Sequence, residues 1–551
     1  MDKTLRSVFC LHLSGAYSFV YITGGEMTKA SNLSGLELAT AETCKYVSIL
    51  LLSAGLGLVS AFYSPLLPLV TTFLFTAGMI ALYTNSYYRS TASETLARPV
   101  PEEIRRHGVL FYLFSFAFFV SITVPKSGKT IGSIPVTTAN MLILLALCLW
   151  FIHVLFSHHA NITIPVSKPI IAFILYGIGS ALLGLIYQND LKQLVLEFVA
   201  FIGFIPIYFL TCSLVRTTKQ IQLLLVAVVV SFILVCGYGV LQIRLGFATV
   251  AVPGLTEQYG LIQYAQFGGR WNIIEGGYKL YSTFQNGNIL GNHLATFIPL
   301  LGGILIGMRR FWRKALVSGV FLLACYTLVL TYSRGAAVGT LSGIFVFLVL
   351  SKKISVRMVV LVIVLLAVIS VLIYQFADRP EMNRFNLRRI SENPDQFSAG
   401  RLKRAEQVLF GFKEFSLVKK LFGVGFGGTI ITPFYWRFQL VDNLYLSFLF
   451  KFGLVGLAIF LWALAKLFFK ILAYRSDITD TRIRGVINGG IAGLFGSLVH
   501  NLADALWFFP PLAANFWFLA GITVCLATIG RRQATLEMNP GFLQKSTNTH
   551  Q

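Results

Sequence analysis

Arginines stand at the ends of apolar blocks in this sequence, where a charge is costly unless it has a partner. Arg334 lies in the short sequence Tyr332-Ser333-Arg334-Gly335 between two apolar blocks, and Arg401 lies in a long polar interval. Guanidinium groups are permanently charged and donate parallel hydrogen bonds, which suits them to phosphate and pyrophosphate. Arg334 by itself fits a lipid phosphate equally well, because long cationic side chains reach toward headgroups. These residues therefore indicate anion binding, and the anion is a substrate or a lipid.

The polar interval 375–440 is the largest break in the apolar pattern. Long loops cross a membrane whatever their charge, so its positive balance is not a topology signal. It indicates an anionic partner such as pyrophosphate, with attraction to anionic headgroups as the alternative. Its cations are Arg379, Arg384, Arg388, Arg389, Arg401, Lys403, Arg404, Lys413, Lys419, Lys420 and Arg437.

Part of this interval has the period of an amphipathic helix. Leu402, Ala405, Leu409 and Phe412 follow one another at helical spacing, which predicts a helix that lies on the membrane or on the bundle. We expect Arg401 in the first turn, where a cation opposes the helix dipole. An anion bound at the same N-terminus would remove that conflict.

The glycine-rich sequence at 423–428 resembles a nucleotide-binding loop only superficially. No predicted strand precedes it, and no Lys-Ser or Lys-Thr pair closes it. We interpret it as tightly turned backbone that is able to approach a neighbour closely.

Other polar residues also gather where apolar blocks begin or end. Asp442 and Asn443 open a block, where Asp442 is a candidate helix cap and equally a candidate general base. The sequence 282–293 carries several amides, including Asn288, and ends in His293, so we expect it to face the protein interior or a wet cavity. His500, Asn501 and Asp504 form a further polar group.

Composition excludes a soluble protein. The chain has 551 residues, of which 56% are hydrophobic and 12% charged, whereas soluble domains carry about 25% charged residues. The net charge of +23 is explained by cytoplasmic loops, which collect Lys and Arg, and does not indicate nucleic acid. The seven cysteines contain no Cys-x-x-Cys pair, so metal and disulfide roles are disfavoured. We see no cleavable signal peptide.

The apolar blocks predict an all-α polytopic membrane protein with about 12–14 transmembrane helices and a large, partly helical extracytoplasmic loop. We expect Lys451 and Gly453 to break the longest block. The predicted spans are 44–63, 65–84, 108–124, 136–157, 169–187, 193–215, 220–243, 286–307, 314–331, 335–350, 357–376, 443–474, 484–500 and 510–530.

The distribution of basic residues predicts that both termini are cytoplasmic, because Lys and Arg recur in alternate loops. The chain is then divided into a cytoplasmic or interfacial segment, 1–43; N-terminal spans, 44–243; an outer loop, 244–285, with Arg270; spans with the Ser-Arg-Gly turn, 286–376; the large outer loop, 377–441; C-terminal spans, 442–530; and a cytoplasmic tail, 531–551.

These motifs, in this order, resemble the O-antigen ligase and Wzy-type polymerase superfamily over roughly residues 280–530. The resemblance is carried by Ser333-Arg334-Gly335, by Arg401 followed by a helix and the glycine-rich sequence, and by Asp442-Asn443 at the next span. The sequence 283–291 is similar to that family's motif at the start of a span. The resemblance implies a metal-independent membrane glycosyltransferase without a cofactor, in the bacterial inner (plasma) membrane and active on the extracytoplasmic side.

The resemblance also implies residue roles. Arg334 and Arg401 would hold the pyrophosphate of an undecaprenyl-diphosphate-linked oligosaccharide, with Asp442 as the third catalytic candidate. Ligases of this family carry His-Asn where this chain has Asp442-Asn443, which favours a polymerase of O-antigen or exopolysaccharide repeat units. The base stays open between Asp442, His500 and none. The predicted substrate-binding residues are Arg270, Asn288, Tyr332, Ser333, Arg404, Asn443 and His500.

Two alternatives remain at this point. One is a ligase of the same superfamily that transfers the glycan to a lipid A core or another acceptor. The other is a transporter of anionic solutes, which should show inverted repeats and mid-span ionisable residues. We find no convincing repeat, and the polar groups cluster at the outer ends of spans. The lipid bilayer is the expected surroundings, flippase and chain-length regulator proteins are candidate partners, and nucleic acid is not expected.

Overall fold

The computed structural model describes part of the chain. The predicted spans 44–63, 65–84 and 357–376, residues 377–400 and Arg270 lie outside the described residues. Described are residues 9–13, 16–23, 26–29, 102–131, 134–156, 164–202, 204–247, 249–252, 273–274, 277–351, 401–428, 430–431, 437–438 and 442–538.

The chain divides into two compact units, Met1–Tyr112 and Leu113–Gln551. The first contains a three-stranded antiparallel sheet of β1 (Phe9–Leu13), β2 (Ala16–Thr23) and β3 (Glu26–Lys29). In its register, Phe9 pairs with Val20, and Val20 pairs with Lys29. α3 (Glu102–Thr123) runs across the boundary between the two units.

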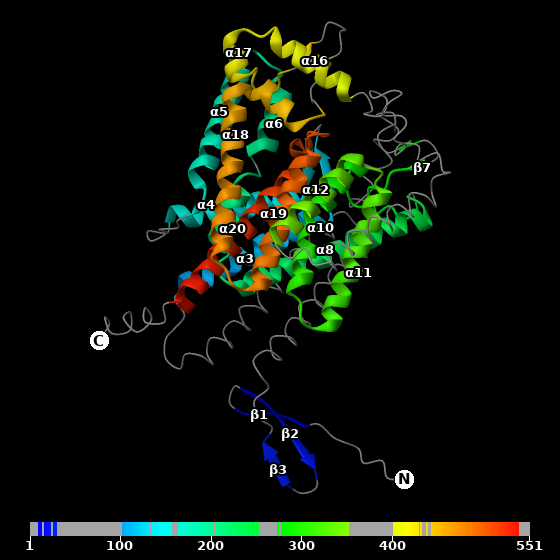
Figure 1. The fold of residues 1–551 in the computed structure, drawn as a ribbon, viewed down its shortest axis with the longest axis vertical. Coiled ribbons are helices and arrows are strands. Elements are labelled where there is room, and N and C mark those ends of the chain that lie inside the picture. Colours follow the sequence, from blue (N-terminus) through cyan, green and yellow to red (C-terminus); the bar gives the residue numbers. More distant parts are fainter. Residues whose placement is uncertain are drawn as a thin grey trace, which may run out of the picture. The chain divides into compact units, whose positions relative to one another are not determined.

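The second unit is built of helices, with short hairpins between them (Figure 1). Three antiparallel hairpins join β4 to β5, β6 to β7 and β8 to β9. The elements are β4 (Gly128–Ile131), β5 (Ile134–Thr137), α4 (Thr138–Phe156), α5 (Ser167–Ile186), α6 (Leu191–Ile202), α7 (Pro206–Leu214), α8 (Thr218–Leu245), β6 (Ile273–Ile274), β7 (Gly277–Tyr278), α10 (Gly287–Gly307), α11 (Phe311–Leu330), α12 (Arg334–Ser351), α16 (Arg401–Lys413), α17 (Leu417–Phe422), β8 (Ile430–Ile431), β9 (Arg437–Phe438), α18 (Leu444–Ser476), α19 (Thr481–His500), the 3-10 turn η2 (Leu506–Phe508) and α20 (Pro510–Met538).

Seven helices among the described residues are long and apolar enough to cross a membrane: α5, α8, α10, α11, α12, α18 and α20. This confirms the predicted all-α, multi-pass membrane architecture. α5 shows the lipid-facing pattern clearly, because apolar side chains such as Leu175, Leu182 and Ile186 are exposed on it. In water such a surface would be a liability, and against lipid tails it is the stable arrangement.

Two predicted spans have internal breaks. The span predicted at 193–215 is wrong as one helix: α6 ends at Ile202, and α7 begins at Pro206. The reason is local, because proline has no N–H to donate and its fixed φ suits the first turn of a new helix. The break expected in the longest block is confirmed, since Gly453 in α18 has φ 66°, outside the helical region.

α10, α12 and α19 pack against one another in the centre of the second unit. Glycines allow this, because a Cβ on Gly493 would lie 2.0 Å from the Thr296 carbonyl oxygen of α10. A Cβ on Gly339 of α12 would lie 2.5 Å from the Gly496 carbonyl oxygen of α19. Small residues are how helices approach closely where no water drives their association.

We expect Gly493→Ala to destabilise the protein by about 1–3 kcal/mol, because the new methyl group overlaps backbone that is unable to move aside. The measurement is thermal unfolding of the purified protein in detergent. Gly319→Ala in α11 is the matched control: its Cβ would meet no described atom within 4 Å, and it should stabilise by about 0.5–1 kcal/mol. Equal unfolding temperatures for the two variants would contradict close packing at Gly493.

Candidate functional site

The turn between α11 and α12 carries Arg334. Tyr332 has φ 48°, a left-handed conformation that is uncommon for a residue with a side chain. The Thr331 hydroxyl accepts a hydrogen bond of 3.2 Å from the Ser333 N–H and so closes the turn. Arg334 follows as the first residue of α12 and is half-buried. Strained turns of this kind persist where surrounding packing fixes them, and they are common at binding sites.

His500 joins this turn to α19. It is the last residue of α19, is fully buried, and its Nε2 lies 3.5 Å from the Ser333 hydroxyl. Its Nδ1 lies 3.3 Å from the Asn292 amide nitrogen of α10. Gly335 also rests on the imidazole, since a Cβ there would lie 2.7 Å from the ring. Arg334 therefore stands between two residues that touch His500.

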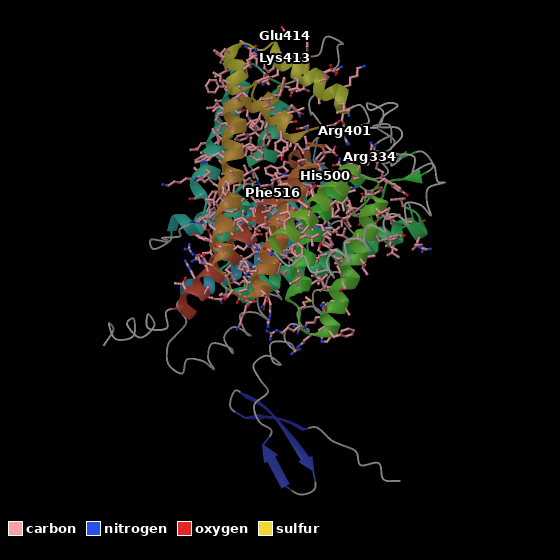
Figure 2. The ribbon with its side chains drawn as sticks, viewed as in Figure 1. Arg334, Arg401, Lys413, Glu414, His500 and Phe516 are labelled. Carbon is pink, nitrogen blue, oxygen red and sulfur yellow. The ribbon has the colours of Figure 1, made fainter. Side chains whose placement is uncertain are left out.

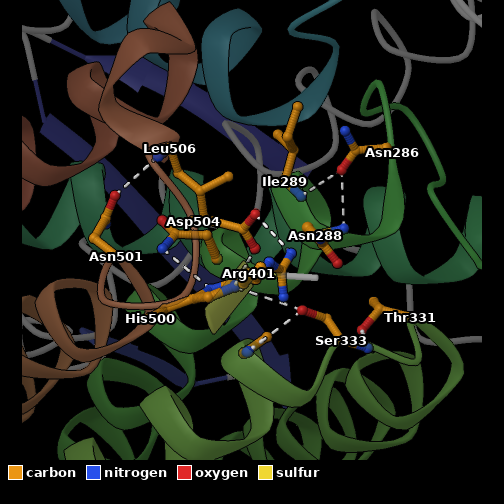
Figure 3. A network of polar contacts seen from close by, with 12 residues as sticks. Asn286, Asn288, Ile289, Thr331, Ser333, Arg401, His500, Asn501, Asp504 and Leu506 are labelled. Atoms are coloured by element: carbon orange, nitrogen blue, oxygen red, sulfur yellow. Dashed lines mark hydrogen bonds and ion pairs between the residues drawn. The ribbon is translucent and has the colours of Figure 1, made fainter. Parts of the chain in front are cut away.

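Asp504 connects Arg401 to the same group (Figure 3). An Nη atom of Arg401 lies 2.8 Å from Asp504 Oδ1, and Asp504 Oδ2 lies 3.6 Å from His500 Nε2. The Arg401 side chain is 25% exposed and that of Asp504 is 11% exposed, so the ion pair is shielded from water on most sides. Arg401 opens α16, which confirms its predicted place in the first turn.

α16 rests on the start of α18 through Val408, which is 2% exposed and packs with Phe415, Val424, Leu446 and Phe450. The predicted apolar stripe is only partly right. Leu402 and Leu409 are exposed, because the side that meets the bundle is centred on Val408. These two leucines lie on the outer side of the helix, where apolar side chains suit contact with lipid.

Asp442 lies in a second polar group. It pairs with Arg404 of α16. The prediction that Asp442 caps α18 is wrong: Asn443 is the N-cap, and its side-chain oxygen accepts a hydrogen bond of 2.9 Å from the Leu446 N–H. The Asn443 amide also donates to the Leu502 carbonyl oxygen over 2.8 Å. This ties the end of the large loop to the turn that carries Asp504.

The polar residues at the start of α10 have two environments: Asn286 and Asn288 lie at the helix end, and His293 lies in the protein interior. Asn286 caps α10 by accepting hydrogen bonds of 2.9 Å from the N–H groups of Asn288 and Ile289, and Asn288 is half-buried at this helix end. His293, one turn deeper, pairs with Asn515 at 3.0 Å and stacks on Phe232. His293 thus faces the protein interior, as the sequence predicts.

The structure brings some of the predicted site residues together. Figure 2 shows Arg334, Arg401 and His500 near one another in the second unit, and contacts link Ser333, His500, Asp504 and Arg401 in a row. Arg404 and Asp442 pair separately. The sequence named Asp504 only as part of a polar group with His500 and gave it no partner. Its position four residues after His500 was the available signal. That spacing places both side chains on one side only if the chain stays helical after His500. Arg270 lies outside the described residues.

The chemistry available here is anion binding with a carboxylate nearby. Guanidinium groups stabilise charge that grows on phosphate oxygens. Among the described residues, no group of three or more His, Cys, Asp and Glu side chains has the arrangement that holds a metal ion. The absence of a cofactor stays a prediction.

Residues 319–461 match the family model described as O-Antigen ligase. The match contains the Ser-Arg-Gly turn, Arg401, Asp442 and Asn443. Over these residues the chain is similar to the O-antigen ligase and Wzy-type superfamily, which confirms the predicted resemblance. The match supports a glycan-transferring membrane enzyme. No curated protein matches the chain.

The ion pair of Arg401 with Asp504 and that of Arg404 with Asp442 should contribute differently to the free energy of unfolding. Asp504→Asn removes the charge from a well-shielded pair, and we expect a loss of about 2 kcal/mol. Asp442→Asn acts on a pair whose side chains are about a third exposed, and the change should stay within about 1 kcal/mol. Thermal unfolding in one detergent compares them. A larger loss for Asp442→Asn would show that Asp504 does not hold Arg401 in solution.

Proposed function

We propose that this chain polymerises undecaprenyl-diphosphate-linked oligosaccharide repeat units into a surface polysaccharide, an O-antigen or an exopolysaccharide. The observation that carries the proposal is the row of contacts from Arg401 through Asp504 and His500 to Ser333. It gathers two arginine-bearing segments that are far apart in sequence, within a helical bundle that is similar to the O-antigen ligase family over residues 319–461.

In the proposed reaction a sugar hydroxyl of one lipid-linked unit attacks the anomeric carbon of a second lipid-linked chain. A new C–O glycosidic bond forms, and the bond between the anomeric carbon and the diphosphate oxygen breaks. Undecaprenyl diphosphate leaves with the electron pair of that bond. The hydroxyl proton passes to a base or to the leaving diphosphate, so charge and atoms balance.

Arg401 and Arg334 carry the leaving group in this proposal. Negative charge grows on the diphosphate as the glycosidic bond breaks, and fixed guanidinium groups stabilise it without reorganising. Asp504 fixes Arg401, and the buried ring of His500 fixes the turn before Arg334. Around them, the further binding residues would be Arg270, Asn288, Tyr332, Ser333, Arg404 and Asn443. Two bulky substrates must also meet in one orientation, so positioning supplies much of the rate.

Asp442 is the better-placed base. Its side chain is 34% exposed beside α16 and can therefore meet an incoming hydroxyl. His500 has no exposed surface, and both ring nitrogens face protein groups within 3.6 Å. We therefore assign His500 a positioning role and propose that Asp442 accepts the proton of the attacking hydroxyl. Arg404 would orient the carboxylate toward the incoming hydroxyl.

Polymerase and ligase differ in the acceptor. The description of the family model itself favours the ligase. Asp442 at the position where the family's ligases carry a histidine favours the polymerase. The family match supports a glycan-transferring enzyme over the transporter alternative. We place the site on the extracytoplasmic side of the bacterial inner membrane, where flippase and chain-length regulator proteins would be neighbours.

We expect Arg401→Ala and Arg334→Ala each to lower polymer formation by about 100-fold or more, the usual cost of removing one charge-stabilising donor. Arg401→Lys should keep part of the activity, since it keeps the charge but loses the parallel hydrogen bonds. The readout is glycan chain length on a gel, from cells that lack the chain and are complemented with each variant. Arg309→Ala, at an exposed arginine after α10, is the control. Normal polymer from Arg401→Ala would sink the pyrophosphate role.

The lipid-linked glycans of the same cells separate the two enzymes. Cells without a polymerase should accumulate single repeat units on undecaprenyl diphosphate. Cells without a ligase should accumulate full-length polymer on that lipid and none on the final acceptor. Full-length lipid-linked polymer in the Arg401→Ala cells would therefore overturn the polymerase in favour of the ligase.

Asp442→Asn should lower polymer formation by about 100-fold, which is typical of the loss of a general base. The cap of α18 is unaffected, because Asn443 supplies it. Gel analysis with protein amounts matched by immunoblot measures the effect. Unchanged chain length would leave Asp442 with only its ion pair to Arg404.

A further inference from the structure

A buried ion pair lies away from the arginine site. Lys451 Nζ of α18 is 2.6 Å from Glu197 Oε2 of α6, and the two side chains are 2% and 4% exposed. Removing two charges from water costs several kcal/mol per ion unless further hydrogen bonds satisfy them. An ionisable pair inside a membrane protein is therefore seldom neutral filler. Neither residue contacts the arginine site.

The Glu197 carboxylate has hydrogen-bond partners on both oxygens: Oε2 contacts Lys451 and Gly427, and Oε1 contacts Gln193. Its Oε2 also accepts a hydrogen bond of 2.9 Å from the Gly427 N–H. Its Oε1 accepts one of 2.9 Å from the Gln193 amide. One carboxylate thus joins α6, α18 and residues 423–428, which we name the glycine segment.

The glycine segment runs directly against α5 and the start of α6. Gly425 and Gly427 have φ 77° and 72°, conformations that side chains disfavour. A Cβ on Gly425 would lie 2.4 Å from the Gly184 nitrogen of α5. The Asn189 amide donates to the carbonyl oxygens of Val424 and Phe426, both over 2.8 Å. The segment is therefore fixed to the α5–α6 corner by backbone contacts that only glycine permits.

The same segment is bonded to the first arm of α18, which we define as residues 444–452. The N–H groups of Val424 and Gly425 donate to the carbonyl oxygens of Phe450 and Lys451, over 3.1 and 3.0 Å. The arm ends at Gly453, where the helix breaks. At this break the arm is also held to α5, because the Tyr176 hydroxyl donates a hydrogen bond of 2.6 Å to the Phe452 carbonyl oxygen. Lys451, the last but one residue of the arm, adds the charged contact to α6.

α16 rests on the joined arm and glycine segment, because Val408 packs between Phe450 and Val424. Arg401 is the first residue of α16. A continuous set of contacts thus runs from Glu197 through the arm to Arg401.

We propose that Glu197 and Lys451 are positioning residues: their ion pair anchors the first arm of α18 and the glycine segment to α6, and thereby holds α16 and Arg401 at the site. The inference rests on the proposed function for its catalytic consequence. Its structural part, the anchoring of α16 and α17, stands without it.

Trypsin cleavage tests the anchoring independently of activity. Lys413 is exposed at the end of α16, and Lys419 and Lys420 lie on α17. We expect Glu197→Gln and Lys451→Met to speed cleavage at these lysines at least 10-fold in the full-length protein in nanodiscs. Lys466→Met, an exposed lysine on the same helix α18, is the matched control and should cleave like the wild type.

Wild-type cleavage rates in both variants would overturn the proposal. Where a single variant gives no monodisperse protein, Glu197→Gln with Lys451→Met decides instead. That pair leaves no unpaired charge, and the glutamine oxygen can still accept from Gly427. Fast cleavage in the double variant supports the ionic anchor, and wild-type cleavage overturns it.

A double-mutant cycle tests whether the anchor acts through Arg401. Glu197→Gln should lower polymer formation at least 10-fold in the wild type and add no further loss to Arg401→Ala. Additive losses would mean a general structural role and would overturn the positioning assignment. Normal polymer from Arg401→Ala would refute the proposed function instead, while the cleavage rates would still test the anchor.

Discussion

Close contact between the backbones of α10, α12 and α19 is the constraint on which the site depends. The contact requires glycine at Gly339 and Gly493, where any Cβ would overlap a carbonyl oxygen of the facing helix. Because the three helices touch, their ends coincide, and His500 at the end of α19 meets Ser333 and Asn292. In lipid this geometry is favoured by packing and internal hydrogen bonds, since apolar surface gains nothing by leaving the membrane.

Charge supplies the second level of organisation. The large loop returns to the bundle through Arg401 with Asp504 and Arg404 with Asp442. Deeper in the protein, Lys451 pairs with Glu197, and we propose that this pair anchors the arm of α18 on which α16 rests. The pairs differ in depth: the Arg404 pair is about a third exposed, the Arg401 pair is better shielded, and the Lys451 pair is buried. Removing one partner is therefore most costly at Lys451.

Much of the fold followed from the sequence. Long apolar blocks predict membrane helices because a bilayer demands about 20 apolar residues in a row. The break in the longest block was predicted at Lys451 and Gly453, and the structure places it at Gly453. The break between α6 and α7 was missed, because the apolar run continues through it and only Pro206 marks it. Arg334, Arg401 and His500 were predicted as separate site residues from their type and their place beside apolar blocks.

Residue type and order determined that this is a multi-pass membrane protein and predicted its resemblance to the ligase superfamily, because hydropathy, charge and motif order can be read directly from the chain. Only the tertiary structure decided which polar groups meet. In the structure Asp504 pairs with Arg401, and Asn443, not Asp442, caps α18. Lys451 pairs with Glu197, 254 positions away in the sequence. Such pairings depend on how helices cross and where a backbone can approach another, and those distances are fixed by the packing of the whole bundle.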